Sequence, residues 1–142
     1  MKDFLLSGAP LRKGNSWVLL LLRIFVSCMM LFHGFSKLAN FTALSVSFPD
    51  PLGVGPGVSL ICSVLAETGC SLLLLFGIFT RLALLPLIFN MIVAIWVVHG
   101  PDPFAVKELG MMYLAIYVVF FFIGGGRYAF DYWFFRRKKS EG

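Results

Sequence analysis

The chain has 142 residues, of which 59% are hydrophobic and only 13% are charged. So few charged residues cannot cover the surface of a soluble globule of this size, and the composition predicts a one-domain, all-α membrane protein. The formal net charge of +5 does not indicate nucleic-acid binding, because most of the basic residues flank apolar segments and are better explained by membrane topology.

Four apolar segments, each long enough to cross a bilayer as a helix, follow one another along the chain. Within a membrane domain of residues 17–126, their bounds are residues 17–36, 57–79, 82–98 and 103–123. The first segment is too long for the apolar region of a cleaved signal peptide, so we expect it to stay in the membrane behind an N-terminal segment of residues 1–16. The sequence therefore predicts a four-transmembrane-helix bundle.

The connections between these spans differ in length and composition. Residues 38–56 are rich in proline, glycine and polar residues, which predicts a loop with enough apolar side chains for part of it to lie on the membrane surface. Only Thr80 and Arg81 separate the second and third spans, so these two helices should form an antiparallel hairpin. Asp102 is predicted to cap the fourth span, with Pro103 at its first helical position.

The C-terminal tail, residues 127–142, mixes aromatic residues with five Arg and Lys residues. This mixture predicts a short interfacial helix on an anionic leaflet. Nine Lys and Arg residues fall on the side of the two termini, and two fall on the opposite side. Because basic residues accumulate on the cytoplasmic side, both termini and the basic tail are expected to be cytoplasmic.

A carboxylate near the middle of the second span is the most informative polar residue of the chain. Burying ionised Glu67 in a bilayer costs about 2.5–3.5 kcal/mol on insertion scales, so another residue should offset its charge. Arg23 is the only basic residue well inside another apolar segment, and helical rise places Asn90 between the two in depth. We therefore predict a polar core of Arg23, Glu67 and Asn90, which either binds a ligand or only fixes helix register.

A second group of polar residues is predicted nearer the outer ends of the helices. His33, Lys37 and Glu108 reach similar depths there, and an imidazole beside a cation and a carboxylate suits proton handling. The alternative is that His33 is an ordinary interfacial histidine. His99 is expected to be a surface residue, and the sequence contains no haem, metal-binding or hydrolase motif.

Several short motifs, in this order and spacing, resemble the DoxX family of membrane proteins. They are LLLRIF at residues 20–25, HGFSKL at 33–38, LAETGCSLLLLFGIFTRLA at 65–83, KELGMMYL at 107–114 and GGGRYAFD at 124–131. The resemblance implies a four-helix integral membrane protein. It also implies that the family's polar positions correspond to Arg23, His33, Lys37, Glu67, Arg81, Glu108, Arg127 and Asp131.

The resemblance also bears on function. The family takes its name from a subunit of a thiosulfate:quinone oxidoreductase or terminal quinol oxidase. Other relatives are linked to membrane redox complexes and thiol stress, and distant ones to receptor assembly. This chain has no haem-ligating pair inside the membrane, so the oxidase activity itself is not carried over.

The residues and the resemblance together leave three functions open. The leading hypothesis is an accessory subunit of the bacterial inner membrane, associated with a membrane redox system, that binds a quinone or another amphipathic ligand at the Arg/Glu cluster. The second is a non-catalytic assembly or chaperone-like membrane module. The third is a small transporter or proton pathway, for which four spans without an inverted repeat give less support. The expected partners are the lipid bilayer, a membrane redox protein and a second copy of the chain.

Overall fold

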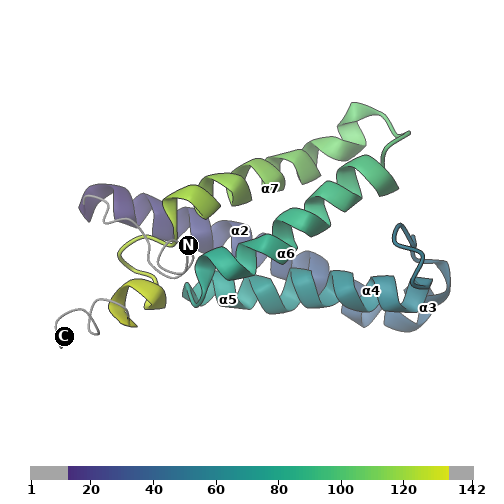
Figure 1. Cartoon of the computed structure of the whole chain (residues 1–142), viewed down its shortest axis with the longest axis horizontal. Coiled ribbons are helices and arrows are strands. Elements are labelled where there is room, and N and C mark those ends of the chain that lie inside the picture. Colours follow the sequence, from purple (N-terminus) through teal and green to yellow (C-terminus); the bar gives the residue numbers. More distant parts are fainter. Residues whose placement is uncertain (1–12, 135–142) are drawn as a thin grey trace.

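The computed structural model describes residues 13–134, and its regular secondary structure over that range is entirely helical (Figure 1). Most of the predicted N-terminal segment and the end of the predicted basic tail lie outside the described residues. The elements, in chain order, are α2 (Lys13–Ala39), α3 (Phe41–Ser47), α4 (Pro56–Val64), the π-helical segment η1 (Leu65–Cys70), α5 (Ser71–Phe76), α6 (Thr80–Ile92), the π-helical segment η2 (Val93–Val98) and α7 (Phe104–Ile123).

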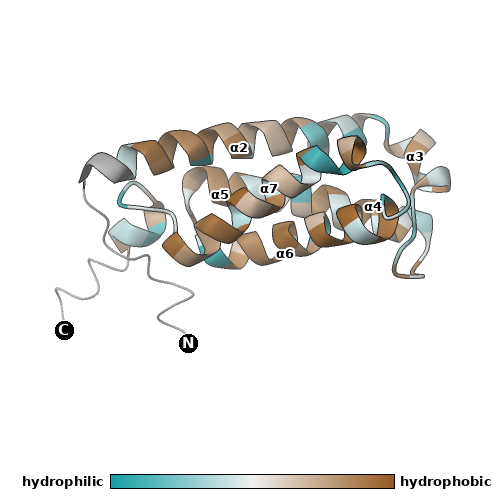
Figure 2. Ribbon diagram, turned by 90° about the horizontal axis from the view of Figure 1, so that it is seen from above, coloured by the Kyte–Doolittle hydropathy of each residue, from teal (hydrophilic) through white to brown (hydrophobic). Residues whose placement is uncertain are grey.

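Four continuous helical rods in this structure are long and apolar enough to cross a membrane. They are Ser16–Ala39, Pro56–Phe76, Thr80–Val98 and Phe104–Ile123. Hydrophobic residues run along most of each rod, and hydrophilic residues gather toward the two ends of the bundle (Figure 2). Large apolar side chains such as Leu21, Phe32, Leu82 and Phe122 are exposed, as expected for a surface that faces lipid. The protein is thus an all-α membrane protein with four transmembrane helices.

The rods alternate in direction, which gives the bundle two distinct ends. The basal end contains the start of α2, the turn at residues 77–79 and the segment after α7, residues 124–134. The loop end contains residues 40–55 and residues 99–103. Toward the loop end, α6 and α7 diverge from α4 (Figure 1). The cytoplasmic placement of the basal end remains a prediction from charge counting.

Three local features differ from the sequence-based expectation. The second rod ends at Phe76 because Gly77 adopts a left-handed conformation with φ 70°, and the amide of Ile78 donates back to the carbonyl of Leu73 at 2.9 Å, as in a Schellman motif. The short helix α3 forms within the predicted loop. Asp102 does not cap α7, whose N-cap is Pro103; the Asp102 carboxylate lies 2.7 Å from His99 Nδ1 instead.

The basal end is held together by hydrogen bonds between charged side chains and the backbone. Arg23 is 1% exposed and donates to the carbonyls of Gly125 at 2.7 Å and Tyr128 at 3.1 Å. Asp131 accepts from the amides of Phe79 and Thr80, each at 2.7 Å. These contacts fasten residues 124–134 to α2 and to the start of α6. Helical backbone resumes at residues 130–134, where a short helix was predicted.

A third charged side chain at this end caps the last helix. Arg81 donates to the carbonyls of Phe121 and Phe122, both at 2.9 Å. These carbonyls belong to the last turn of α7, where backbone acceptors lack helical partners and the helix dipole favours a cation. The end of α7 is therefore tied to the start of α6.

α2 packs most closely against η1 at Gly34. A Cβ atom built on Gly34 would lie 2.3 Å from Thr68 Oγ1, 3.1 Å from the Thr68 amide nitrogen and 3.2 Å from the Glu67 carbonyl carbon. Two of these neighbours are backbone atoms, which cannot move without shifting a helix. The absence of a side chain at Gly34 thus sets the distance between α2 and the segment that carries Glu67.

Substitution of Gly34 by alanine is expected to destabilise the protein by about 1–3 kcal/mol, as overpacking does in other cores. Gly69→Ala is the matched control, because a Cβ at Gly69 meets nothing within 4 Å. Thermal unfolding in detergent should show a clear loss for Gly34→Ala and no loss for Gly69→Ala. Equal stability of the two variants would contradict the close approach of α2 to η1.

Candidate functional site

The polar centre of the bundle is the carboxylate of Glu67, which lies within η1 and is 3% exposed. Lys37 Nζ lies 2.5 Å from its Oε1 atom, and Asn90 Nδ2 donates to the same oxygen at 2.8 Å. Ser63 donates to it at 3.1 Å and accepts from Lys37 at 2.9 Å. We call Lys37, Ser63, Glu67 and Asn90 the carboxylate cluster; three rods contribute to it.

The pairing predicted between Arg23 and Glu67 is wrong, and the direction of helical side chains explains why. Each Cα–Cβ bond in a helix tilts toward the N-terminus of that helix. On α2, which runs from the basal end to the loop end, Arg23 and Lys37 therefore lean toward the basal end. Glu67 lies on a rod of opposite direction and leans toward the loop end. Lys37 and Glu67 consequently converge, whereas Arg23 and Glu67 diverge.

Both π-helical segments lie beside the carboxylate cluster. η1 carries Glu67 and packs against α2 and α6, and η2 continues α6 beyond Asn90 toward His99. A π-helical turn widens the helix and changes the direction of its side chains, and such turns occur frequently at functional sites. Two such segments, one carrying Glu67 and one following Asn90, mark this part of the bundle as the candidate site.

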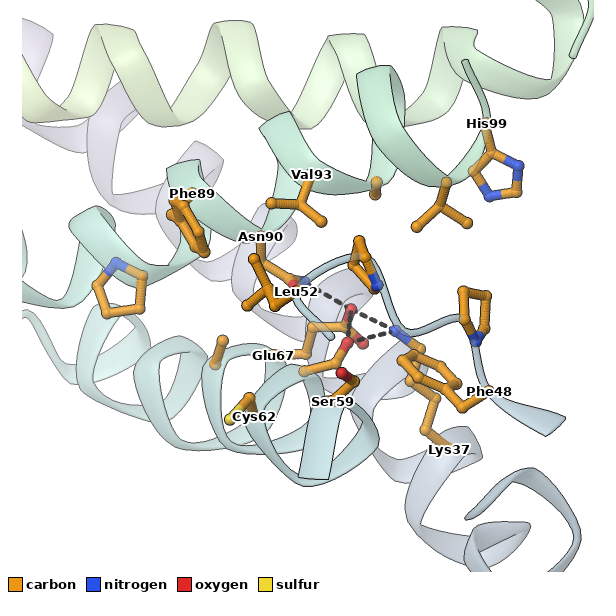
Figure 3. Close-up of a pocket in the computed structure, with 17 residues that line it drawn as sticks. Lys37, Phe48, Leu52, Ser59, Cys62, Glu67, Phe89, Asn90, Val93 and His99 are labelled. Atoms are coloured by element: carbon orange, nitrogen blue, oxygen red, sulfur yellow. Dashed lines mark hydrogen bonds and ion pairs between the residues drawn. The ribbon is translucent and has the colours of Figure 1, made fainter. Parts of the chain in front are cut away.

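A cavity of about 380 Å³ opens between α4 and η2 at the loop end (Figure 3). Glu67, Lys37 and Asn90 provide charged and polar groups on its wall. The rest of the lining is mostly apolar: Phe48, Pro49, Pro51, Leu52, Cys62, Ala66, Pro86, Phe89, Val93, Ala94 and Val98, together with Ser59, Ser63 and His99. In the close-up, the Lys37 side chain reaches from α2 to Glu67, and Asn90 approaches from the facing helix.

The loop that contributes to this lining is folded around Asp50. Its Oδ1 atom accepts from the Val54 amide at 3.0 Å and the Ser59 hydroxyl at 2.7 Å, and its Oδ2 atom accepts from the Gly55 amide at 2.7 Å. The Ser59 hydrogen bond, followed by those from the backbone, holds the pKa of Asp50 below its ordinary value. Asp50 thereby joins the loop to the first turns of α4.

A second cavity, of about 160 Å³, adjoins the same ion pair. It is lined by Met30, His33, Lys37, Glu67, Met91, Ala94, Ile95, His99, Val106, Lys107, Leu109, Gly110 and Tyr113. The His33 ring stands edge-on to the Tyr113 ring, with 6.1 Å between centroids. Lys37 and Glu67 thus line both cavities, and two histidines, His33 and His99, line the smaller one.

The structure brings together some of the predicted site residues and separates others. Glu67 and Asn90 are in contact, and Lys37 and His33 line the second cavity. Arg23 lies at the basal end, bound to backbone carbonyls. Glu108 is exposed on α7 and lines neither cavity, so the predicted outer group of His33, Lys37 and Glu108 does not form as one cluster.

Sequence reasoning missed two kinds of site residue. Ser63 lies one helical turn before Glu67, and this spacing alone indicates a shared face. His99 was expected at the surface, and its side chain is 42% exposed; that it also lines both cavities was shown by no sequence pattern. Among the described residues, no group of three His, Cys, Asp or Glu side chains could hold a metal ion.

Comparison with known proteins places these residues in a family context. The model of the DoxX family matches residues 18–100, a range that includes Lys37, Glu67 and Asn90. An uncharacterized protein of Haemophilus influenzae is 33% identical to the chain over 135 residues, which is 89% of this chain and 98% of that relative. No solved structure matches.

Replacing Lys37 by methionine should destabilise the protein, because it leaves a buried carboxylate without its cation. The loss should exceed the roughly 1 kcal/mol of an exposed pair and stay at or below the roughly 3–5 kcal/mol of a fully buried one, since the Lys37 side chain is 28% exposed. The double variant Lys37→Met/Glu67→Met removes both charges and should recover most of the loss. Unfolding of the wild type and both variants in detergent measures these losses. A double variant as unstable as Lys37→Met would contradict the predicted recovery.

Asp50→Asn should loosen the loop over the cavity. Hydrogen exchange at the Val54 and Gly55 amides is expected to accelerate at neutral pH, with Asp102→Asn as the control. Because folding lowers the pKa of Asp50, the carboxylate stabilises the loop above the ordinary pKa of about 4. This contribution is lost as the pH falls through the lowered value. Unchanged exchange in Asp50→Asn would show that other contacts hold the loop.

Proposed function

The chain belongs to the DoxX family, and we propose that it is a subunit of the bacterial inner membrane that binds a quinone or another amphipathic ligand for a membrane redox system. The observation that carries this proposal is the apolar cavity with a buried ion pair on its wall. In the proposed site, Lys37 takes the place that the sequence analysis gave to Arg23, beside Glu67 and Asn90. Intramembrane ionisable residues that face a bundle interior are typical of functional sites.

The size and lining of the cavity suit a small amphipathic molecule. Ligand pockets usually measure about 300–1,000 Å³ and combine apolar walls with a few convergent polar groups, and this cavity measures about 380 Å³. Phe89 and Val93 offer apolar contacts to a ring. The diverging helices at the loop end leave room for the ligand in the half of the bundle that contains the cluster.

The carboxylate cluster offers hydrogen-bond donors to a ligand carbonyl. An ammonium group has three N–H donors, and Lys37 uses two of them on Glu67 and Ser63. The Asn90 amide has two N–H donors, of which one binds Glu67. A quinone carbonyl placed at the cluster could accept from either remaining donor, and these donors would fix its orientation.

Electron transfer would be shared between the ligand and a partner protein. A quinone carries its own redox chemistry, so the helices would supply position, desolvation and electric field. The DoxX relatives linked to membrane redox complexes support this sharing of roles between ligand, protein and partner. The proposed partner is accordingly a membrane oxidoreductase that exchanges electrons with the quinone held at the cluster.

Ligand binding tests this proposal directly. Purified protein in detergent should bind a decyl-substituted benzoquinone by equilibrium dialysis, and extraction of the protein should release native quinone. The double variant Lys37→Met/Glu67→Met should weaken binding at least about tenfold, while Glu108→Gln, a carboxylate change outside both cavities, should leave it unchanged. The proposal fails if the wild-type protein binds no quinone, or if the double variant binds as well as the wild type.

A further inference from the structure

The two oxygens of Glu67 have very different surroundings. Oε1 accepts hydrogen bonds from Lys37, Ser63 and Asn90. Oε2 is buried and has no hydrogen-bond partner among the described residues. The side chain as a whole is 4% exposed and lines both cavities. An unpartnered, buried carboxylate oxygen therefore lies at the candidate binding site.

An unpartnered acceptor of this kind needs a donor from outside the described chain. A buried polar atom without a hydrogen bond costs about 1–3 kcal/mol, and a charged one costs more. The three donors of the cluster all lie at Oε1, so none of them meets this need at Oε2. Because Oε2 is buried within membrane-spanning helices, bulk water does not supply the missing hydrogen-bond donor.

From this asymmetry we infer that the cavity selects a ligand whose polar head donates a hydrogen bond, namely the phenolic hydroxyl of a quinol, over the oxidised quinone. The inference rests on the proposed function and specifies which redox form the site holds. A quinol hydroxyl can donate to Oε2 and accept from Lys37 or Asn90 with the same oxygen. It would thus supply the hydrogen bond that Oε2 lacks among the described residues.

The oxidised form makes a poorer match to the same groups. A quinone carbonyl has acceptor lone pairs and no hydrogen to donate, so beside Oε2 two acceptors would face each other. The ionised carboxylate would repel that carbonyl, and Oε2 would still lack a donor. The remaining donors of Lys37 and Asn90 would hold a quinone only in part. The binding site is therefore better matched to the reduced ligand.

Binding of matched compounds provides the test. Dissociation constants are measured in detergent, under anaerobic conditions, for a decyl-substituted benzoquinone, its quinol and the dimethyl ether of that quinol. The quinol should bind at least about tenfold more tightly than the quinone, a difference worth about 1.4 kcal/mol. The dimethyl ether has nearly the same ring but no donor, and it should bind no better than the quinone.

The variant Glu67→Gln tests whether Oε2 is the group responsible. An amide whose oxygen keeps the position of Oε1 presents an N–H donor in place of Oε2, so the preference for quinol should disappear or reverse. Glu108→Gln should keep the wild-type preference. Equal binding of quinone and quinol by the wild type, or an unchanged ratio in Glu67→Gln, would overturn the inference while leaving the proposed function intact. Failure of every compound to bind would overturn the proposed function itself.

Discussion

The ion pair between Lys37 and Glu67 is the constraint around which the loop-end half of the bundle is built. A carboxylate inside the membrane is tolerated only where a cation and further donors surround it, and here α2, α4 and α6 each supply one. α2 can bring Lys37 close because Gly34 lets it approach η1. Because Glu67 has to be reached from three rods at one level, the cluster fixes their relative depth as well as their rotation.

Arginine and lysine serve different purposes at the two ends of the molecule. The planar guanidinium of Arg23 binds two carbonyls of the segment after α7, a use that suits its fixed fork of donors. The ammonium of Lys37 is a compact charge on a flexible stem. It neutralises one carboxylate oxygen of Glu67 and leaves its third N–H donor available to a ligand. The basal end is consequently fastened by backbone contacts, whereas the loop end keeps a cavity beside its charged pair.

Hydropathy predicted the four rods because apolar length is a strong signal, and Glu67 was correctly expected to need a counter-charge. Its partner was predicted wrongly because a comparison of depths by helical rise ignores the tilt of side chains toward the helix N-terminus. On α2 this tilt carries both Lys37 and Arg23 toward the basal end. Lys37 therefore moves toward the level of Glu67, and Arg23 moves farther from it. The π-helical segments η1 and η2 leave no periodic pattern in the sequence. The position of His99 beside both cavities depends on the end of η2, so it could not be read from spacing either.

The sequence left open whether the buried polar residues form a ligand site or only fix helix register. The distribution of donors bears on this choice. A cluster that served register alone would lose nothing by sharing its donors between both oxygens of Glu67, and it would gain by leaving neither unsatisfied. Instead, the three cluster donors all meet at Oε1, and Oε2 remains buried without a partner next to a cavity. A carboxylate beside a cavity that has one oxygen fully hydrogen-bonded and the other without a donor favours a site that a ligand completes.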